Sequence, residues 1–288
     1  MHEPFAGKKI NFEFCWVQDL WWYIDGWQWH GLQWGTGSNL LICFHGFGED
    51  AARFQVLEEA LGSDFTIVAL DLPFHGGTRL DTSVDAASLP VNWQLLIQQI
   101  MQRFHQQRCA LLGYSLGGRI CLQLIQEMPQ LIHLLILLAP DGLHHNFWFY
   151  FLTRTYIGKR LFRWHVDHPH LFFGITQSLE KIGFLSPSFK KFLDGQMNTR
   201  SKRMQVWRTW NSLRTFVPDL AQVKKNIQRF EIACYLLFGK YDRVIKPDYG
   251  TTFCKSLAQA RMFILDCGHQ LLTTETAMFI KQQLDLHS

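Results

Sequence analysis

A glycine-tyrosine-serine-leucine-glycine stretch at residues 113–117 has the residue types and spacing of a nucleophile turn. An apolar segment, 109–112, precedes it, and residues 116–128 follow it with apolar side chains at helical spacing. A serine on so tight a strand-to-helix turn takes a strained backbone conformation, and glycines on either side leave room where side chains would collide. The pattern predicts that the hydroxyl of Ser115 is exposed at the end of a strand.

A base and an acid follow this serine at the ends of two later apolar segments. Asp242 comes shortly after segment 232–238, and His269 comes shortly after segment 261–265. A serine hydroxyl is a weak nucleophile until a base removes its proton, and the base needs an acid to hold its tautomer and orientation. The order serine, acid, histidine therefore predicts a catalytic triad of Ser115, Asp242 and His269.

A glycine-rich turn upstream offers backbone donors for the same chemistry. The apolar segment 40–44 runs into His45-Gly46-Phe47-Gly48, and Leu116 opens the helix that follows the serine. Backbone N–H groups at such turns can stabilise the negative charge that develops on a carbonyl oxygen under attack. We expect the amides of Phe47 and Leu116 to form an oxyanion hole.

Two other aspartates compete for the role of the triad acid. Asp71 precedes the nucleophile in the chain, and its side chain is expected to brace the turn at His75. Asp266 lies close to the histidine, but at the end of the last strand it is expected to fix that turn. Asp242 is therefore retained as the acid.

Neither a metal nor a cofactor is predicted. His165, His168 and His170 lack a nearby acidic or cysteine cluster, and Pro169 interrupts any helical spacing between them. The chemistry of a serine triad needs no cofactor.

Short apolar segments that alternate with helical ones predict a mainly parallel sheet covered on both faces. The opening differs, because Ile10–Gln18 and Leu20–Trp34 have the alternation of an antiparallel meander around Asp25-Gly26. The central strands are expected at 40–44, 66–70, 109–113, 132–138, 232–238 and 261–265, with helices at 51–61, 93–108 and 116–128.

The alternation stops at residue 141 and resumes near residue 231, which leaves about ninety residues that are too many for a loop. We therefore divide the chain into a core of residues 1–140 and 231–288 and an inserted helical unit of residues 141–230. The insert holds fifteen lysines and arginines against five aspartates and glutamates, a net charge of +10. Since the whole chain carries +4, the remainder carries −6, and the insert is the part that can attract an anion.

The composition is that of a globular protein, with 48% hydrophobic and 18% charged residues among 288. Its seven cysteines are an odd number without a C-x-x-C pair, which favours free thiols in a reducing compartment. The N-terminus has no basic stretch leading into an apolar run, and the longest apolar segment, 131–140, is about half the length that spans a bilayer. A cytoplasmic location is expected.

Taken together, five motifs in this order resemble the α/β-hydrolase superfamily: His45-Gly46-Phe47, residues 71–78, residues 113–117, Gly239 with Asp242, and Gly268-His269. The resemblance covers roughly residues 40–140 and 230–285. It implies an α/β fold with a mostly parallel, twisted, eight-stranded sheet flanked by helices, and a helical lid inserted after the sixth strand. The ninety-residue insert falls at that position.

A narrower resemblance concerns residues 113–119, which are similar to the nucleophile turn of the menaquinone-pathway SHCHC synthases. These are lyases of the same superfamily. The resemblance implies that Tyr114 and Arg119 contact substrate carboxylates. An ion-paired or solvated Arg119 is the equal alternative.

The insert also holds seventeen aromatic residues, including the run 147–151, and the cations Lys159, Arg160 and Arg163. One interpretation is an amphipathic surface for an anionic membrane or an acyl chain. We favour the alternative, in which the aromatic face packs on the core and the cations lie in solvent. Nucleic acid is not expected as a partner, because no binding module is visible. The oligomeric state is left open.

Three functions are consistent with these observations. The first is hydrolysis of a carboxylic ester, thioester or related carbonyl compound, with a small anionic or acyl substrate. Serine at the turn argues against haloalkane dehalogenase and epoxide hydrolase chemistry, which in this superfamily uses an aspartate there. The second is an SHCHC-synthase-like lyase reaction with the same triad. The third is a catalytically silent α/β-hydrolase that acts as a binding module.

Overall fold

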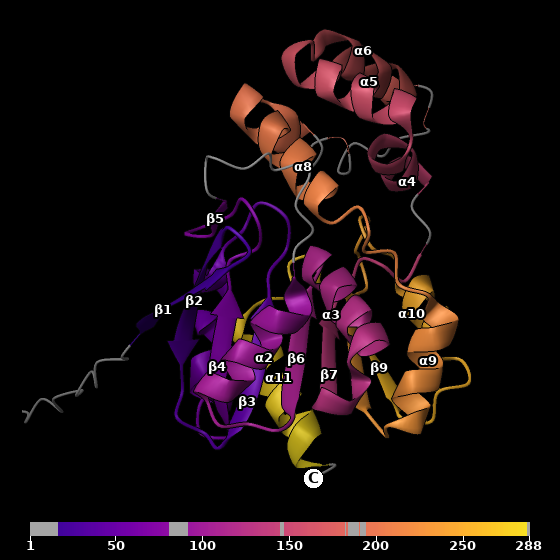
Figure 1. Cartoon of the computed structure of the whole chain (residues 1–288). Coiled ribbons are helices and arrows are strands. Elements are labelled where there is room, and N and C mark those ends of the chain that lie inside the picture. The colour runs from indigo at the N-terminus through magenta and orange to yellow at the C-terminus, as the bar shows by residue number, and fades with distance from the viewer. Residues whose placement is uncertain are drawn as a thin grey trace, which may run out of the picture.

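The computed structural model describes residues 17–80, 92–144, 147–181, 183, 190 and 194–286. Its centre is one nine-stranded sheet (Figure 1). Eight strands form the continuous order β1-β2-β4-β3-β6-β7-β8-β9, and the short β5 pairs with β2 beside that path. The strands are β1 (Gln18–Ile24), β2 (Trp27–Trp34), β3 (Asn39–Phe44), β4 (Phe65–Leu70), β5 (Arg79–Leu80), β6 (Cys109–Tyr114), β7 (Ile132–Leu138), β8 (Ala233–Gly239) and β9 (Ala260–Leu265).

Along the continuous path, every pair of neighbouring strands from β4 to β9 is parallel. Their continuous apolar sequences are typical of strands buried on both faces. In β3, Leu40, Ile42 and Phe44 belong to one core cluster, and Leu41 and Cys43 belong to the other. Successive side chains of a strand point to opposite faces, so the two clusters lie on the two sides of the sheet.

Helices cover both clusters. On one face lie α2 (Trp93–Arg103), α3 (Leu116–Glu127), α9 (Leu220–Arg229) and α10 (Pro247–Cys254). On the other face lie the 3₁₀ helix η1 (Ala51–Leu57), α1 (Glu58–Leu61) and α11 (Thr274–Asp285). The short 3₁₀ helix η2 (Pro129–Leu131) precedes β7. The α/β prediction with a mostly parallel sheet is confirmed, and β5 is an addition to the eight expected strands.

The antiparallel start is also confirmed where the structure describes it. The β1-β2 hairpin turns at Asp25 and Gly26, whose φ angles are 48° and 77°. Positive φ at both positions is the geometry that tight hairpins favour. The segment expected from Ile10 lies outside the described residues up to residue 16, and β1 begins at Gln18.

Two helices differ from their expected form. Residues 51–61, expected as one helix, form the 3₁₀ turns of η1 followed by the single α-helical turn of α1. The helix expected over 93–108 ends at Arg103, because His105 takes a φ of 53° and the N–H of Gln106 reaches back to the carbonyl of Met101 at 2.9 Å. Such a left-handed residue closes a helix C-terminus.

The predicted insert divides into two parts in the structure. Helices α4 (Phe147–Arg154), α5 (Tyr156–Asp167), α6 (His170–Lys181) and α8 (Arg200–Ser212) stand beyond one end of the sheet (Figure 1). We call residues 147–212 the helical insert. By contrast, α9 packs against α3, where the side chain of Asn226 donates to the carbonyl of Ile125 at 2.9 Å. Residues 213–230 of the predicted lid therefore lead back to the flank of the core.

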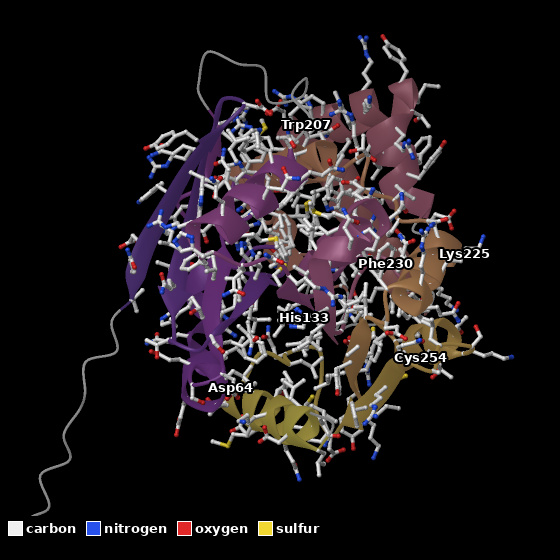
Figure 2. All side chains as sticks on the ribbon, turned by 60° about the horizontal axis from the view of Figure 1, so that its bottom comes forward. Asp64, His133, Trp207, Lys225, Phe230 and Cys254 are labelled. Carbon is white, nitrogen blue, oxygen red and sulfur yellow. The ribbon has the colours of Figure 1, made fainter. Side chains whose placement is uncertain are left out.

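Figure 2 makes the same division visible in side chains. Trp207 of α8 lies at the end of the molecule where the helical insert stands. By contrast, Lys225 of α9 and Phe230, which follows α9, lie on the flank of the core, on the same side as Cys254 of α10. Within the described ranges, every helix is too short or too polar to cross a lipid bilayer.

Candidate active site

Ser115 stands on a strained turn between β6 and α3. Its φ of 49° and ψ of −113° place it in a region that L-residues with a side chain rarely adopt. The N–H of Ser115 donates to the carbonyl of Leu138 at 2.9 Å, and its own carbonyl accepts from Gly118 and Asp141 at 2.9 and 2.8 Å. Backbone hydrogen bonds on both sides thus hold the strained conformation, and none of them uses the side-chain hydroxyl.

The glycines around the serine are needed for space, as predicted. A Cβ atom on Gly117 would lie 1.9 Å from the carbonyl oxygen of Phe44, and one on Gly113 would lie 2.7 Å from that of Gly117. Backbone atoms of β3 and α3 occupy these positions and cannot swing aside as a flexible side chain can. The close approach is what brings the start of α3 against the sheet.

Replacing Gly117 with alanine is therefore expected to abolish folding to the native state. The collision is with backbone of the central sheet, so the cost exceeds the roughly 1–3 kcal/mol of ordinary overpacking. Gly174 in α6 is the matched control, because nothing lies within 4 Å of its Cβ position. Gly174→Ala is expected to leave the protein folded, and urea unfolding followed by circular dichroism measures both variants. A folded Gly117→Ala variant of ordinary stability would contradict this packing.

The three residues predicted as a triad are in contact. The Nδ1 atom of His269 lies 2.7 Å from Oδ2 of Asp242, and its Nε2 atom lies 3.1 Å from the hydroxyl of Ser115. The side chain of Asp242 is fully buried and that of His269 is 16% exposed. These are hydrogen-bonding distances for a base that is oriented by an acid on one side and faces a nucleophile on the other.

The acid is held from its other oxygen. Oδ1 of Asp242 accepts from the N–H groups of Val244 and Ile245 at 2.7 and 2.9 Å. The two backbone donors hold the carboxylate in a fixed orientation. Gly239 lets the turn after β8 touch the turn after β9, since a Cβ there would lie 2.0 Å from the carbonyl oxygen of Gly268. This contact brings Asp242 and His269 together.

The competing acid Asp266 lies elsewhere. Its side chain is 77% exposed, and its Oδ1 atom lies 3.6 Å from Nζ of Lys240 in a surface ion pair. The structure therefore brings His269 to Asp242 and leaves Asp266 on the surface.

The two predicted oxyanion donors lie on neighbouring turns. Phe47 is in the turn after β3, and Leu116 is the first residue after the nucleophile. Because β3 and β6 are paired in register, with Phe44 opposite Gly113, the two turns leave the sheet side by side.

Two buried histidines hold the turn after β3. Nε2 of His45 accepts from the N–H of Leu72 at 3.0 Å, and Nε2 of His75 accepts from that of Gly48 at 3.1 Å. Since these ring atoms accept, the other ring nitrogens carry the proton, and Nδ1 of His45 donates to the carbonyl of Gly46 at 2.6 Å. Burial and the neighbouring His75 lower the pKa of His45 to about 3, so it is neutral in this network.

Asp71 braces the same region, as expected from the sequence. Its carboxylate is 2% exposed and accepts from the N–H groups of Ala51 and Gly77 at 2.7 and 2.6 Å. It also contacts Nδ1 of His30 at 2.6 Å, and Nε2 of His30 contacts Asp19 at 2.9 Å. The cluster ties β2 to the segment that follows β4. Sequence reasoning did not find His30, which lies far from Asp71 in the chain.

We expect His30 to make stability depend on pH. Burial alone would lower the pKa of His30, but hydrogen bonds and ion pairs with Asp71 and Asp19 outweigh it and raise that pKa above 6.5. A raised histidine pKa contributes stability that is complete below the unfolded value and is lost as pH rises through the folded value. His30→Gln should therefore lower the free energy of unfolding by about 1 kcal/mol near pH 6 and by less near pH 9. This value is kept small because solvent screens the ion pair with the exposed Asp19.

Thermal unfolding of both proteins from pH 5.5 to pH 9 measures this effect. The Asp19→Asn variant, which removes only the exposed partner, is expected to show a smaller change of the same sign. A stability difference between wild type and His30→Gln that stays constant over this range would contradict the assignment.

The two predicted substrate contacts have partners within the protein. The hydroxyl of Tyr114 donates to the carbonyl of His269 at 3.2 Å, and burial is the main cause that raises the pKa of this phenol. Arg119 is 3% exposed and binds both oxygens of Asp141, at 2.9 and 3.0 Å. It also donates to the carbonyl of Phe216 at 3.1 Å. The ion-paired alternative describes the observed contacts of Arg119, and contact with substrate stays a prediction.

Glu49 is a residue near the site that sequence reasoning missed. It follows the glycine-rich turn, and a Cβ on Gly46 would lie 3.3 Å from its Oε2 atom. Burial raises the pKa of this carboxyl, against the opposing charge of Arg53, and His269 is among the charges that act on it. Its Oε2 atom is buried without a hydrogen-bond partner in the described part of the chain. The position of Glu49, directly after the glycine-rich turn 45–48, was the feature of the sequence that could have placed it near the site.

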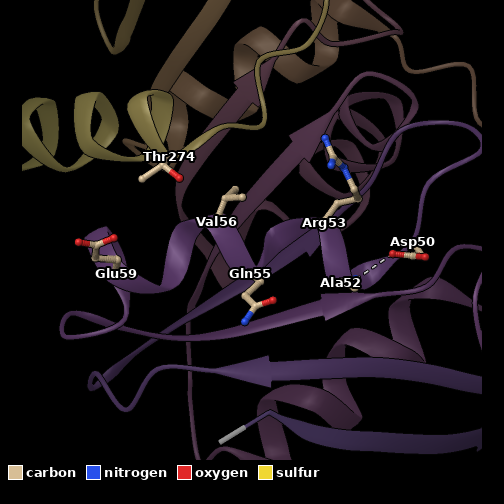
Figure 3. A pocket seen from close by; sticks show the side chains of 7 residues that line it. All are labelled: Asp50, Ala52, Arg53, Gln55, Val56, Glu59 and Thr274. Carbon is tan, nitrogen blue, oxygen red and sulfur yellow. Dashed lines mark hydrogen bonds between the residues drawn. The ribbon is translucent and has the colours of Figure 1, made fainter. Parts of the chain in front are cut away.

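Two pockets flank this region without including the triad among their lining residues. A pocket of about 380 Å³ lies along η1 and α1, with Asp50, Arg53, Glu59 and Thr274 around it (Figure 3). A smaller pocket of about 110 Å³ lies beside Arg119, between α4 and the segment that leads from α8 to α9. The triad, and not either pocket, is therefore the candidate centre of chemistry.

Comparisons with known proteins agree with the fold. The family described as serine aminopeptidase, S33, matches residues 37–276 of this chain. The uncharacterized hydrolase YugF of Bacillus subtilis is 24% identical over 263 residues, which cover 85% of this chain and 91% of that protein. The pimeloyl-[acyl-carrier protein] methyl ester esterase of Aeromonas hydrophila is 35% identical over 107 residues, 37% of this chain and 39% of that protein.

Solved structures share the fold at low sequence identity. The thioesterase domain from the curacin biosynthetic pathway superposes with a TM-score of 0.62 at 16% identity, covering 93% of this chain and 99% of that one. The 2-hydroxy-6-oxo-6-phenylhexa-2,4-dienoate hydrolase of a Rhodococcus species gives a TM-score of 0.63 at 20% identity, covering 96% and 100%. Because the family match spans most of the chain, the protein belongs to the serine aminopeptidase S33 family and is a hydrolase with the α/β-hydrolase fold.

Proposed function

We propose that the protein is a serine hydrolase that cleaves a carboxylic ester, thioester or related carbonyl compound through an acyl-enzyme on Ser115. The observation that carries this proposal is the contact of one imidazole with both partners, at 2.7 Å from Asp242 and 3.1 Å from Ser115. The strained backbone at Ser115 is a second support, because strain of this kind persists where the surrounding structure requires it.

The proposed reaction has two halves. Nε2 of His269 removes the proton of the Ser115 hydroxyl, whose oxygen attacks the carbonyl carbon of the substrate. The amides of Phe47 and Leu116 stabilise the oxyanion, and His269 then gives its proton to the leaving alcohol or thiol. In the second half, His269 deprotonates a water molecule that attacks the acyl-serine, and the carboxylic acid departs as Ser115 regains its proton. Asp242 keeps His269 in the required tautomer throughout.

The helical insert is proposed as the lid that selects a small-molecule substrate. It stands beyond the end of the sheet where the strands lead to Ser115, Asp242 and His269 (Figure 1). Residues 147–212 hold eleven lysines and arginines against three aspartates and glutamates, a net charge of +8, which favours an anionic substrate. Among similar proteins, the names thioesterase and methyl ester esterase both denote acyl transfer to water, which supports the same reaction class here.

A panel of acyl compounds tests the proposal. p-Nitrophenyl esters of graded acyl length, the matching thioesters, and aminoacyl amides would be compared at one concentration of purified protein. We expect turnover of esters or thioesters with an optimum of chain length, and a higher rate for an ester with a distal carboxylate than for its neutral counterpart. Amide turnover without ester or thioester turnover would contradict the proposed substrate class.

The lyase alternative lacks a supporting contact, because Arg119 is engaged by Asp141. A direct assay with the menaquinone intermediate distinguishes it from ester hydrolysis. The binding-module alternative would require that Ser115 fail to react with any serine-directed probe.

A further inference from the structure

The outer face of α5 presents large apolar side chains to solvent. Tyr156 is 76% exposed, Ile157 70%, Leu161 45% and Trp164 44%. Ile157, Leu161 and Trp164 follow at spacings of four and three residues, so they lie in one stripe along the helix. We call these four residues the α5 stripe.

The opposite face of α5 is the one that packs on the rest of the helical insert. Phe162 and Val166 are 4% and 0% exposed, and the ring of Phe162 lies 5.6 Å from that of Trp210 in α8. The inner face of α5 therefore packs on another helix of the insert, and the predicted packing of the aromatic face on the core stays a prediction. The α5 stripe points away from that face, and among the described residues its apolar side chains stay exposed, as those of a docking surface do.

Basic side chains flank the α5 stripe. Lys159 and Arg160 are exposed on the same helix, and Arg160 donates to the hydroxyl of Tyr156 at 3.2 Å. The acid of the helix, Asp167, is shared by Arg163 and Arg200, each at 2.7 Å. The charge available beside the α5 stripe is therefore positive.

We propose that the α5 stripe docks the protein onto an anionic membrane surface. Ile and Leu side chains with Trp and Tyr at their flanks suit the boundary between headgroups and acyl chains, and Lys and Arg suit anionic headgroups. At 1.5 Å per residue α5 is about 18 Å long, too short to cross a bilayer and suited to lie in its plane. The helix α5 lies at the end of the molecule opposite the C-terminus of α11 (Figure 1).

Sedimentation with lipid vesicles tests the proposal on the full chain. Vesicles of phosphatidylcholine alone are compared with vesicles that also contain phosphatidylglycerol, at low and at high salt. We expect binding to the anionic vesicles and its loss at high salt. The triple variant Ile157→Ser, Leu161→Ser and Trp164→Ser should bind at least about tenfold more weakly. Lys159→Gln with Arg160→Gln should weaken binding by about fivefold for each charge removed.

The matched control replaces exposed apolar residues on the core. Ile264 and Met278 are 56% and 53% exposed, and Ile264→Ser with Met278→Ser should leave vesicle binding unchanged. Ser115→Ala should also bind normally, so that the membrane proposal and the catalytic proposal can fail independently. Circular dichroism shows that every variant is folded, and for the variants other than Ser115→Ala turnover of a water-soluble ester shows it as well.

Three results would overturn the proposal. The first is no binding of the folded wild-type protein to anionic vesicles, and the second is equal binding by the triple variant. The third is a dimer in sedimentation velocity that the triple variant abolishes while vesicles have no effect, which would assign the α5 stripe to a second copy of this chain.

Discussion

Ser115→Ala is expected to lower kcat for the best ester or thioester substrate by about 10⁴-fold or more, with folding unchanged. The alanine lacks the oxygen that forms the acyl-enzyme, while His269 and Asp242 keep their own hydrogen bond. Binding and the backbone donors remain, so substrate affinity should change little and only residual catalysis should persist. Steady-state kinetics measures the change in kcat, and urea unfolding shows that the variant is as stable as the wild type.

Ser178 provides a matched control for this variant. Its hydroxyl donates to the carbonyl of Gly174 within α6, far from the triad in the chain. Ser178→Ala should keep full turnover. A Ser115→Ala protein that retains more than about a tenth of the wild-type kcat would exclude Ser115 as the nucleophile.

Arg119→Met is expected to destabilise the protein by about 3 kcal/mol. The variant removes the guanidinium from the carboxylate of Asp141, which within the described ranges keeps only the N–H of Gly142, and from the carbonyl of Phe216. It also removes the guanidinium that lies 4.2 Å from the ring centroid of Phe149. Breaking this ion pair from one side leaves the carboxylate of Asp141, which is only 28% exposed, without its cation. Urea unfolding measures the change.

Arg163→Met is the control, because its ion pair with Asp167 is on the surface. It should cost less than about 1 kcal/mol. The companion change Asp141→Asn should destabilise by an amount that is not additive with Arg119→Met, as expected for residues in contact. If Arg119→Met were as stable as wild type but raised KM for an anionic ester many-fold, the substrate-contact prediction would replace the structural one.

The buried strands and the residues at their ends could be predicted because both depend on local pattern. Segments such as 109–113 are continuously apolar, and parallel strands place their carboxyl ends at one edge. The motifs at these ends then follow in a fixed order, so Ser115, Asp242 and His269 could be grouped before any coordinates. The glycine at 117 was equally predictable, since the tight turn has no room for a Cβ atom.

Contacts between distant side chains could not be predicted. Arg119 and Asp141 are 22 residues apart, and His30 and Asp71 are 41 apart. No local periodicity distinguishes such pairs from solvated charges. The end of the predicted insert was also beyond the pattern, because α9 has the polarity of a surface helix and only its packing on α3 assigns it to the core.

The helical insert is attached to the core close to the nucleophile and has an exposed face on its other side. Arg119 joins the helix behind the nucleophile to both chain segments that link core and insert, through Asp141 on one side and Phe216 on the other. On the outer side of the insert, the α5 stripe faces solvent. An insert anchored at its base and apolar on its outer face could take substrate from an interface, which connects the two proposals without making either depend on the other.

Trapping of the acyl-enzyme tests whether Ser115 is the nucleophile. The protein would be mixed with its best ester or thioester, quenched in acid within milliseconds, and digested for mass spectrometry. We expect an acyl group, with the mass of the substrate acyl chain, on the hydroxyl of Ser115 and absent from Ser115→Ala. Turnover with the acyl group on another residue, or full turnover by Ser115→Ala, would contradict it.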